Sequence, residues 1–140
     1  MAPHPSLKDI LTGHRRIAVV GASPRVDRPS HGVMRYLIGA GYDVVPVNPR
    51  ADEVLGIPCA PTLEAAAERG PLEIVDIFRR PAEVPAVVDD AIALGAAVIW
   101  MQLGITSPEA AERARAAGLA VVEDHCIAVE HNRLTGTPPS

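Results

Sequence analysis

The sequence predicts an α/β fold with a doubly wound, largely parallel sheet of about five strands. Short apolar runs rich in valine and isoleucine alternate along the chain with segments of helical spacing. Glycines stand at predicted helix ends, each shortly before the next apolar run, at Gly41, Gly70, Gly95 and Gly118. Repeated αβ units of this kind form a parallel sheet through right-handed crossovers. We expect the 140 residues to form one domain with its core at about 7–134.

The composition excludes several classes of protein. Hydrophobic residues make up 48% of the chain but aromatic residues only 3%, so the core must consist mainly of small aliphatic side chains. A net charge of −4 provides no general basic surface, so we expect no binding to nucleic acid. No apolar run approaches the ~18 residues that cross a bilayer, and the N-terminus lacks the apolar segment of a signal peptide. We therefore expect a cytoplasmic protein without membrane contact, whose cysteines, Cys59 and Cys126, are thiols.

The two ends of the chain lack packing signals. We expect residues 1–5 to be disordered, because prolines flank a polar histidine there. Ser6 then caps a short helix over residues 7–13, whose apolar positions fall at helical spacing. We also expect the tail, residues 135–140, to be disordered.

The first strand, residues 16–20, is the clearest element of the sheet. Its apolar residues run into Gly21 without polar alternation, as a strand covered on both faces does. Ser30 precedes apolar residues at helical spacing and is predicted to cap the helix that follows. A second strand then covers residues 42–49.

The middle of the chain continues the alternation. Residues 54–61 contain two prolines and form a loop with room for only a short extended piece. Thr62 caps a helix of strong helix formers. Residues 72–78 form the third strand, and residues 84–92 trace one helical face.

The last part of the chain repeats the pattern. Residues 96–102 form the fourth strand, and Thr106 with Glu109 has the spacing of a capping box at the start of an alanine-rich helix. Residues 119–122 form the last strand. A final short helix is predicted over residues 127–134.

The carboxyl ends of the strands carry the candidate binding residues. In open parallel sheets ligands bind at these ends, where the strand order reverses. Arginines gather there in a chain that is acidic overall, which predicts a local anion site: Arg25, Arg28, Arg50, Arg79 and Arg80. The turn after the first strand is Gly21-Ala22-Ser23-Pro24-Arg25, an incomplete form of the dinucleotide fingerprint G-x-G-x-x-G. Taken alone, Gly21 could simply allow the chain to turn.

Linked motifs at these strand ends resemble a known family. They are Val19-Val20-Gly21-Ala22-Ser23 with Arg25, Val47-Asn48-Pro49, Asp76-Ile77-Phe78-Arg79-Arg80, Trp100-Met101-Gln102-Leu103-Gly104, and Glu123-Asp124-His125-Cys126 with Asn132-Arg133-Leu134. In order and spacing they resemble the stand-alone CoA-binding proteins of bacteria. Those proteins are similar in turn to the Rossmann-like CoA-binding domain of the succinyl-CoA synthetase α subunit. The resemblance covers roughly residues 7–134.

The resemblance implies a role for each strand end. Gly21, Ala22, Ser23 and Arg25 would contact the CoA phosphates, and the segment Asn48, Pro49 and Arg50 would lie near the adenosine and its 3′-phosphate. Phe78 and Arg79 would line the adenine side, and Gln102, Leu103 and Gly104 would border the pantetheine arm. Cys126 would belong to the same site. We therefore expect Arg25→Ala and Arg50→Ala each to weaken CoA binding. His125 departs from the family, because an arginine is expected there in many relatives.

Several of these residues also have plainer interpretations. Arg79 and Arg80 could be solvated residues at the start of a helix, and Phe78 could belong to the core. Cys126 could react with the CoA thiol or be an inert buried cysteine. The histidines show no tight metal-ligand spacing, so we expect no metal site.

Three functions remain open at this point. The first is reversible binding of CoA or an acyl-CoA without catalysis, because a chain of 140 residues lacks the second domain with the phosphorylated histidine that the synthetase requires. The second is an NAD(P)-binding enzyme or redox sensor on the same fold. Against NAD are the missing glycines after Gly21 and an arginine, Arg50, where an acidic residue would bind the ribose. The third is a CoA-responsive regulatory subunit, with a homodimer or an unknown protein partner.

Overall fold

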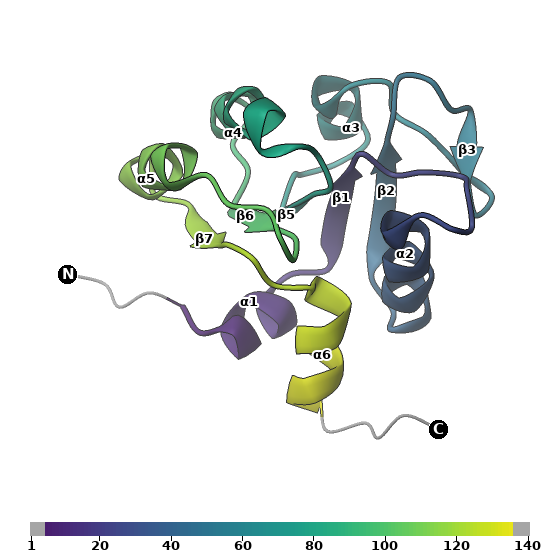
Figure 1. Cartoon of the computed structure of the whole chain (residues 1–140), viewed down its shortest axis with the longest axis horizontal. Coiled ribbons are helices and arrows are strands. Elements are labelled where there is room, and N and C mark those ends of the chain that lie inside the picture. Colours follow the sequence, from purple (N-terminus) through teal and green to yellow (C-terminus); the bar gives the residue numbers. More distant parts are fainter. Residues whose placement is uncertain (1–4, 136–140) are drawn as a thin grey trace.

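A five-stranded sheet forms the centre of the computed structural model, which describes residues 5–135 (Figure 1). Its strands are β1 (Arg16–Val20), β2 (Asp43–Val47), β5 (Ile74–Ile77), β6 (Val98–Met101) and β7 (Ala120–Val122). They lie in the order β2-β1-β5-β6-β7, and every neighbouring pair is parallel. The predicted doubly wound parallel sheet is confirmed.

Helices cover both faces of the sheet. One face carries α1 (Leu7–Gly13), α2 (Pro29–Gly39) and α6 (Ile127–Thr135), as Figure 1 shows. The other carries α3 (Leu63–Glu68), α4 (Val84–Ala93) and α5 (Pro108–Ala116), with the short 3₁₀ helix η1 (Pro81–Glu83) before α4. The chain leaves β1 toward the first face and β5 toward the second. The connections therefore diverge between two adjacent strands, which is where open α/β sheets bind ligands.

The core consists of two aliphatic layers, one on each side of the sheet. Successive strand residues alternate between them, as the period of two in a strand requires. Ile17, Val19 and Ile74 pack with α2, for example, whereas Val75 and Ile77 pack with α4. Most side chains in both layers are Ala, Val, Leu or Ile, as the composition predicted. An exception is Trp100 of β6, which is fully buried and donates a hydrogen bond from Nε1 to the carbonyl oxygen of His125 at 2.8 Å.

A small hairpin occupies the segment that we predicted to be a loop with a short extended piece. Its strands are β3 (Glu53–Val54) and β4 (Ile57–Pro58), which pair antiparallel. The Arg69 side chain, just after α3, donates hydrogen bonds to the carbonyl oxygens of Pro58 at 2.6 Å and Cys59 at 2.9 Å. These bonds tie the hairpin to the helix that follows it.

Two of the predicted helix caps are confirmed. The hydroxyl of Ser6 accepts a hydrogen bond from the Asp9 amide, and the Asp9 side chain completes a capping box. Thr62 accepts a hydrogen bond from the Ala65 amide in the same way. The two helices that begin in this way are α1 and α3.

The other two predicted caps are wrong. Ser30 lies inside the first turn of α2, because Pro29 already occupies a helical position and Arg28 is the N-cap residue. Proline favours the first helical position, since its missing N–H has no partner to lose there. In α5 the N-cap residue is Ser107 rather than Thr106. Its backbone amide donates to Glu123 Oε2 at 3.1 Å, so a side chain from the end of β7 replaces the predicted capping box.

Some boundaries also differ from the prediction. Asn48, Phe78 and Gln102 were expected inside strands but follow the last strand residues. Thr135, expected in a disordered tail, is the last residue of α6. Of the two segments expected to be disordered, residues 1–4 and 136–140 lie outside the described residues. Among the described helices none is long and apolar enough to cross a membrane.

Candidate functional site

A cavity of about 750 Å³ opens at the carboxyl ends of the strands, where the connections diverge. It extends from the turn after β1, past the ends of β5 and β6, to the start of α6. Most of the residues predicted to form the site line it: Gly21, Ala22, Ser23, Asn48, Phe78, Arg79, Gln102, Leu103 and Cys126. Residues distant in the sequence therefore meet in one cavity.

Four predicted site residues do not line this cavity. Arg25 is mostly exposed, with its guanidinium 3.2 Å from the carboxylate of Asp27. Pro49 lines a neighbouring cavity of about 210 Å³, which shares Gly21 and Arg79 with the larger one. The other two are Arg50 and Gly104, whose backbone amides donate to side-chain oxygens of Asn48 and Asp124.

Gly21 allows the turn after β1 to approach the end of β5 closely. Its φ is +89°, in the region that favours glycine. A Cβ atom at this position would lie 2.3 Å from the carbonyl oxygen of Phe78, which no side chain tolerates. The glycine amide also donates to the Val47 carbonyl oxygen at 3.1 Å. The turn is therefore fixed against both neighbouring strands.

Asn48 holds two loops of the site together. Its Nδ2 donates to the carbonyl oxygen of Ala22 at 2.7 Å, and its Oδ1 accepts from the amide of Arg50 at 2.8 Å. The amide side chain thus joins the turn after β1 to the loop after β2. Sequence reasoning placed Asn48 near the ligand but missed this positioning role.

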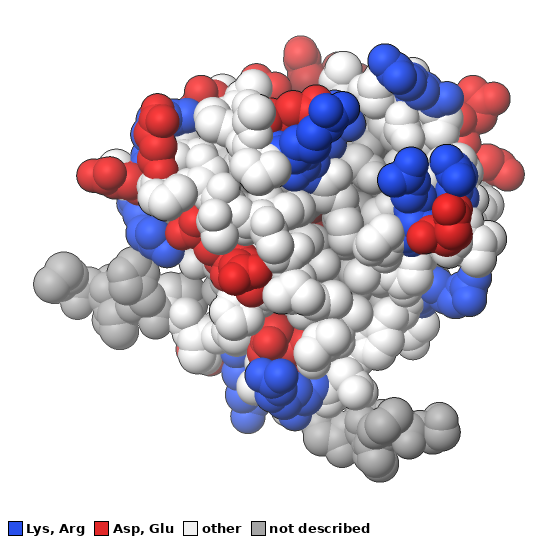
Figure 2. All heavy atoms as spheres, viewed as in Figure 1, with Lys and Arg blue, Asp and Glu red and all other residues white. Residues whose placement is uncertain are grey.

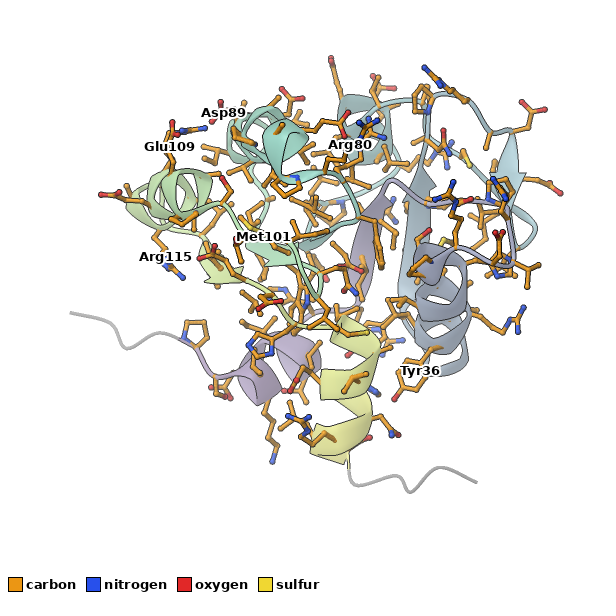
Figure 3. All side chains as sticks on the ribbon, in the orientation of Figure 1. Tyr36, Arg80, Asp89, Met101, Glu109 and Arg115 are labelled. Atoms are coloured by element: carbon orange, nitrogen blue, oxygen red, sulfur yellow. The ribbon has the colours of Figure 1, made fainter. Side chains whose placement is uncertain are left out.

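The cavity is also lined by residues outside the predicted set of CoA contacts. Arg28, Pro29 and Ser30 come from the start of α2, while Arg80 and Pro81 follow β5. Both arginines belong to the local anion site that the sequence predicts, whereas the two prolines and the serine carry no sequence signal of ligand binding. Figure 3 labels Arg80, which lies on the side of the molecule toward which the β1 and β2 arrows point.

Three arginines, Arg28, Arg79 and Arg80, line the cavity. Arg79 is 3.6 Å from Glu83, whereas neither Arg28 nor Arg80 forms an ion pair within residues 5–135. Figure 2 shows basic side chains in several separate groups on the upper part of this face, some of them beside acidic side chains. Unpaired guanidinium groups at the edge of a cavity favour an anion with several acceptor oxygens, such as a phosphate.

The part of the cavity at the end of β6 includes apolar lining residues. The Oε1 atom of Gln102, a buried residue, accepts a hydrogen bond from the Ile127 amide at 3.1 Å and so fixes the first turn of α6. Cys126 is partly buried beside this bond. Leu103 and Ile105 provide apolar surface at the same end, and Leu103 is 70% exposed.

Asp76 is the most unusual ionisable group near the site, although it does not line the cavity. It lies in the middle strand β5 and is fully buried, and neither carboxyl oxygen has a hydrogen-bond partner within residues 5–135. Burial raises its pKa well above the ordinary value, because the loss of hydration disfavours the charged carboxylate. Among the described residues no group of three or more His, Cys, Asp or Glu side chains could hold a metal ion.

The similarity to known proteins covers the part of the chain that contains these strand ends. Residues 15–132 match the protein family described as a CoA binding domain. The chain is 41% identical to the uncharacterized protein YneT of Bacillus subtilis over 125 residues, which cover 89% of this chain and 91% of YneT. It is 31% identical to the ADP-forming acetate–CoA ligase I of Archaeoglobus fulgidus over 129 residues, which cover 84% of this chain but only 18% of the ligase.

A solved structure agrees over nearly the whole chain. The hypothetical protein from Pyrococcus horikoshii OT3 superposes with a TM-score of 0.88 at 42% identity, covering 93% of this chain and 90% of that protein. Sequence and fold thus match together, and they match the region that carries the cavity. The resemblance seen in the strand-end motifs is confirmed, and this chain belongs to the family of CoA binding domains.

Proposed function

We propose that the protein binds CoA or an acyl-CoA reversibly in the cavity at the strand ends and catalyses no reaction of its own. The observation that carries the proposal is the cavity itself, whose lining includes both the unpaired arginines Arg28 and Arg80 and several apolar residues. CoA has groups of both kinds, because its phosphates are anionic and its pantetheine arm is mostly uncharged. We further propose a cytoplasmic location, as expected from the sequence.

The proposed contacts follow from the lining. Arg28, Arg79 and Arg80 would donate charge-assisted hydrogen bonds to the phosphates, together with backbone amides of the turn at Gly21–Ser23. The half-buried ring of Phe78 would cover part of an uncharged group. The pantetheine arm would then extend over Leu103 and Ile105 toward α6.

The proposal of binding without catalysis rests on the ionisable groups of the cavity. Arg28, Arg79, Arg80 and Cys126 are the ionisable side chains among its described lining residues. Acyl or phosphoryl transfer would require a nucleophile with a base and an orienting group within hydrogen-bond reach. The ligase activity in the name of the A. fulgidus relative belongs to a much longer protein, of which this chain matches 18%.

The test is a thermal-unfolding series with CoA, 3′-dephospho-CoA, NAD and NADP at equal concentration. A ligand at 100 times its dissociation constant stabilises the folded state by about 2.7 kcal/mol, which raises the midpoint by several degrees in a domain of this size. We expect a shift with CoA, a smaller one with dephospho-CoA, and none with NAD. A shift with NAD or NADP but not with CoA would replace the proposal with a redox function.

A further inference from the structure

We propose that Cys126 forms a mixed disulfide with the thiol of CoA bound in the cavity. The inference rests on the proposed function, because it takes the cavity as the CoA site. It adds a covalent, redox-dependent form of binding to the reversible one.

The position of Cys126 in the cavity is the first argument. Cys126 follows β7, whereas the turn at Gly21 follows β1, and both line the same cavity. The hydrogen bonds from the His125 amide to the Met101 carbonyl oxygen and from the Ile127 amide to Gln102 Oε1 place Cys126 at the end of β6, with β5 between it and β1. Two strand spacings amount to about 10 Å, so the turn at Gly21 and the cysteine lie at different sides of the cavity. A CoA held there by its phosphates would extend its thiol end toward Cys126.

The apolar part of the cavity lining is the second argument. Val33, Leu103 and Ile105 provide apolar contacts that suit the pantetheine arm. Because Leu103 is 70% exposed, the cavity is open beside the cysteine. A CoA thiol that is released when the mixed disulfide forms can therefore leave the site.

The third argument is that Cys126 is held in place on both sides. The carbonyl oxygen of His125 accepts from Trp100 Nε1 at 2.8 Å, and the amide of Ile127 donates to Gln102 Oε1 at 3.1 Å. Both partners belong to the end of β6. A thiol fixed between two such anchors reacts with a bound partner as an oriented pair rather than by random collision.

The reaction is a thiol–disulfide exchange, and its co-reactant is the symmetrical disulfide of CoA. The Cys126 thiol loses its proton, and its sulfur attacks one sulfur of the CoA disulfide. A bond between Cys126 Sγ and that sulfur forms, and the disulfide bond of the reagent breaks. The released CoA thiolate takes up a proton. The protein cysteine is oxidised and one CoA is reduced, so no further oxidant is needed.

Cys59 provides an internal control for this chemistry. It is also free and partly buried, but it does not line the cavity. Burial raises the pKa of its thiol, which reduces the thiolate available for exchange. The Arg69 guanidinium opposes this rise in pKa, whereas the carboxylates of Asp52 and Glu53 add to it. These two carboxylates would also repel the phosphates of CoA. The two cysteines should therefore differ strongly in their reaction with CoA disulfide.

The experiment is intact-mass spectrometry of the full chain after incubation with CoA disulfide, and separately with glutathione disulfide. We expect one CoA moiety per chain, removed by a reducing agent and mapped to Cys126. Because the cavity orients the reagent, CoA disulfide should react at least about tenfold faster than glutathione disulfide at equal concentration. Cys59→Ser should react like the unmodified protein, and Cys126→Ser should not form the adduct.

Equal rates with both disulfides, or an adduct on Cys59 instead, would overturn the inference. Calorimetric titration of Cys126→Ser with reduced CoA distinguishes this failure from a failure of the proposed function. If the variant binds CoA but the unmodified protein forms no adduct, reversible binding stands and the disulfide does not. If neither protein binds CoA, both proposals fail.

Discussion

The turn at Gly21 can form only because glycine has no side chain. Its backbone lies in the left-handed region, and Phe78 blocks the place where a Cβ would be. We expect Gly21→Ala to lower the free energy of unfolding by about 1 to 3 kcal/mol or more, because the alanine would combine backbone strain with a steric overlap. Urea denaturation measures the change.

A second glycine provides the control for this variant. Gly32 lies inside α2, and a Cβ there would meet no atom within 4 Å. Gly32→Ala should therefore raise the free energy of unfolding by about 0.5 to 1 kcal/mol, as expected for a glycine in a helix. If both variants lose the same stability, the close approach at Gly21 is not the cause.

The arginines of the cavity make separable contributions to the proposed ligand binding. We expect Arg28→Ala and Arg80→Ala each to weaken CoA binding by roughly 1.5 to 3 kcal/mol, since each would lose a charge-assisted hydrogen bond to phosphate. Arg25→Ala, which the sequence predicted to weaken binding as well, is now the matched control, because Arg25 faces Asp27 and does not line the cavity. Calorimetric titration with CoA gives the affinities. A larger loss in Arg25→Ala than in the other two would move the phosphate site to the loop between β1 and α2.

Asp76 should make the stability of the protein depend on pH. Its folded-state pKa is raised by burial above the unfolded value of about 3.9. Between these two values the folded protein keeps a proton that the unfolded chain releases, so this group lowers stability by about 1.4 kcal/mol per pH unit as the pH rises. Asp76→Asn removes the effect. Urea denaturation from pH 4.5 to 7.5 should give curves for the two proteins that diverge; parallel curves would show that Asp76 is ionised in the folded state.

At the scale of elements, α6 depends on a side chain from β6. Gln102 accepts the hydrogen bond of the Ile127 amide inside the protein. Gln102→Met keeps a similar shape but removes the acceptor, which should cost about 1 to 3 kcal/mol. Amide hydrogen exchange should become faster at the start of α6, while β6 stays protected. Leu103→Ala, at the exposed neighbouring position, should leave exchange in α6 unchanged.

The helix starts show which local signals can be trusted. Ser6 and Thr62 were predicted correctly, because each precedes a helix with no competing residue. The prediction for Ser30 was wrong because Pro29 already lies inside the first turn of α2. The prediction for Thr106 was wrong because Ser107 is the N-cap residue of α5 and bonds to the carboxylate of Glu123, which follows a distant strand. The contact between Ser107 and Glu123 has no local signature, so sequence reasoning could not have found it.

At the scale of the whole molecule, the fold could be predicted and the details of the cavity only in part. Strand order and helix layers follow from the alternation of apolar runs and glycines, which is a property of the whole chain. The positions of the strand-end motifs follow from the fold. Which arginines point into the cavity depends on side-chain directions, and these separated Arg28 and Arg80 from Arg25 and Arg50. The positioning role of Asn48 likewise depends on a contact between two loops.

The adjacent positions of α1 and α6 have a consequence for the connectivity of the chain. The two helices pack together on one face of the sheet, and α6 runs away from the cavity over nine residues, or about 13 Å (Figure 1). The first and last helices are therefore neighbours, while the exposed tip of the β3–β4 hairpin at Gly56 lies in another part of the fold. A circular permutation that joins the two ends and reopens the chain at Gly56 would preserve every strand of the central sheet.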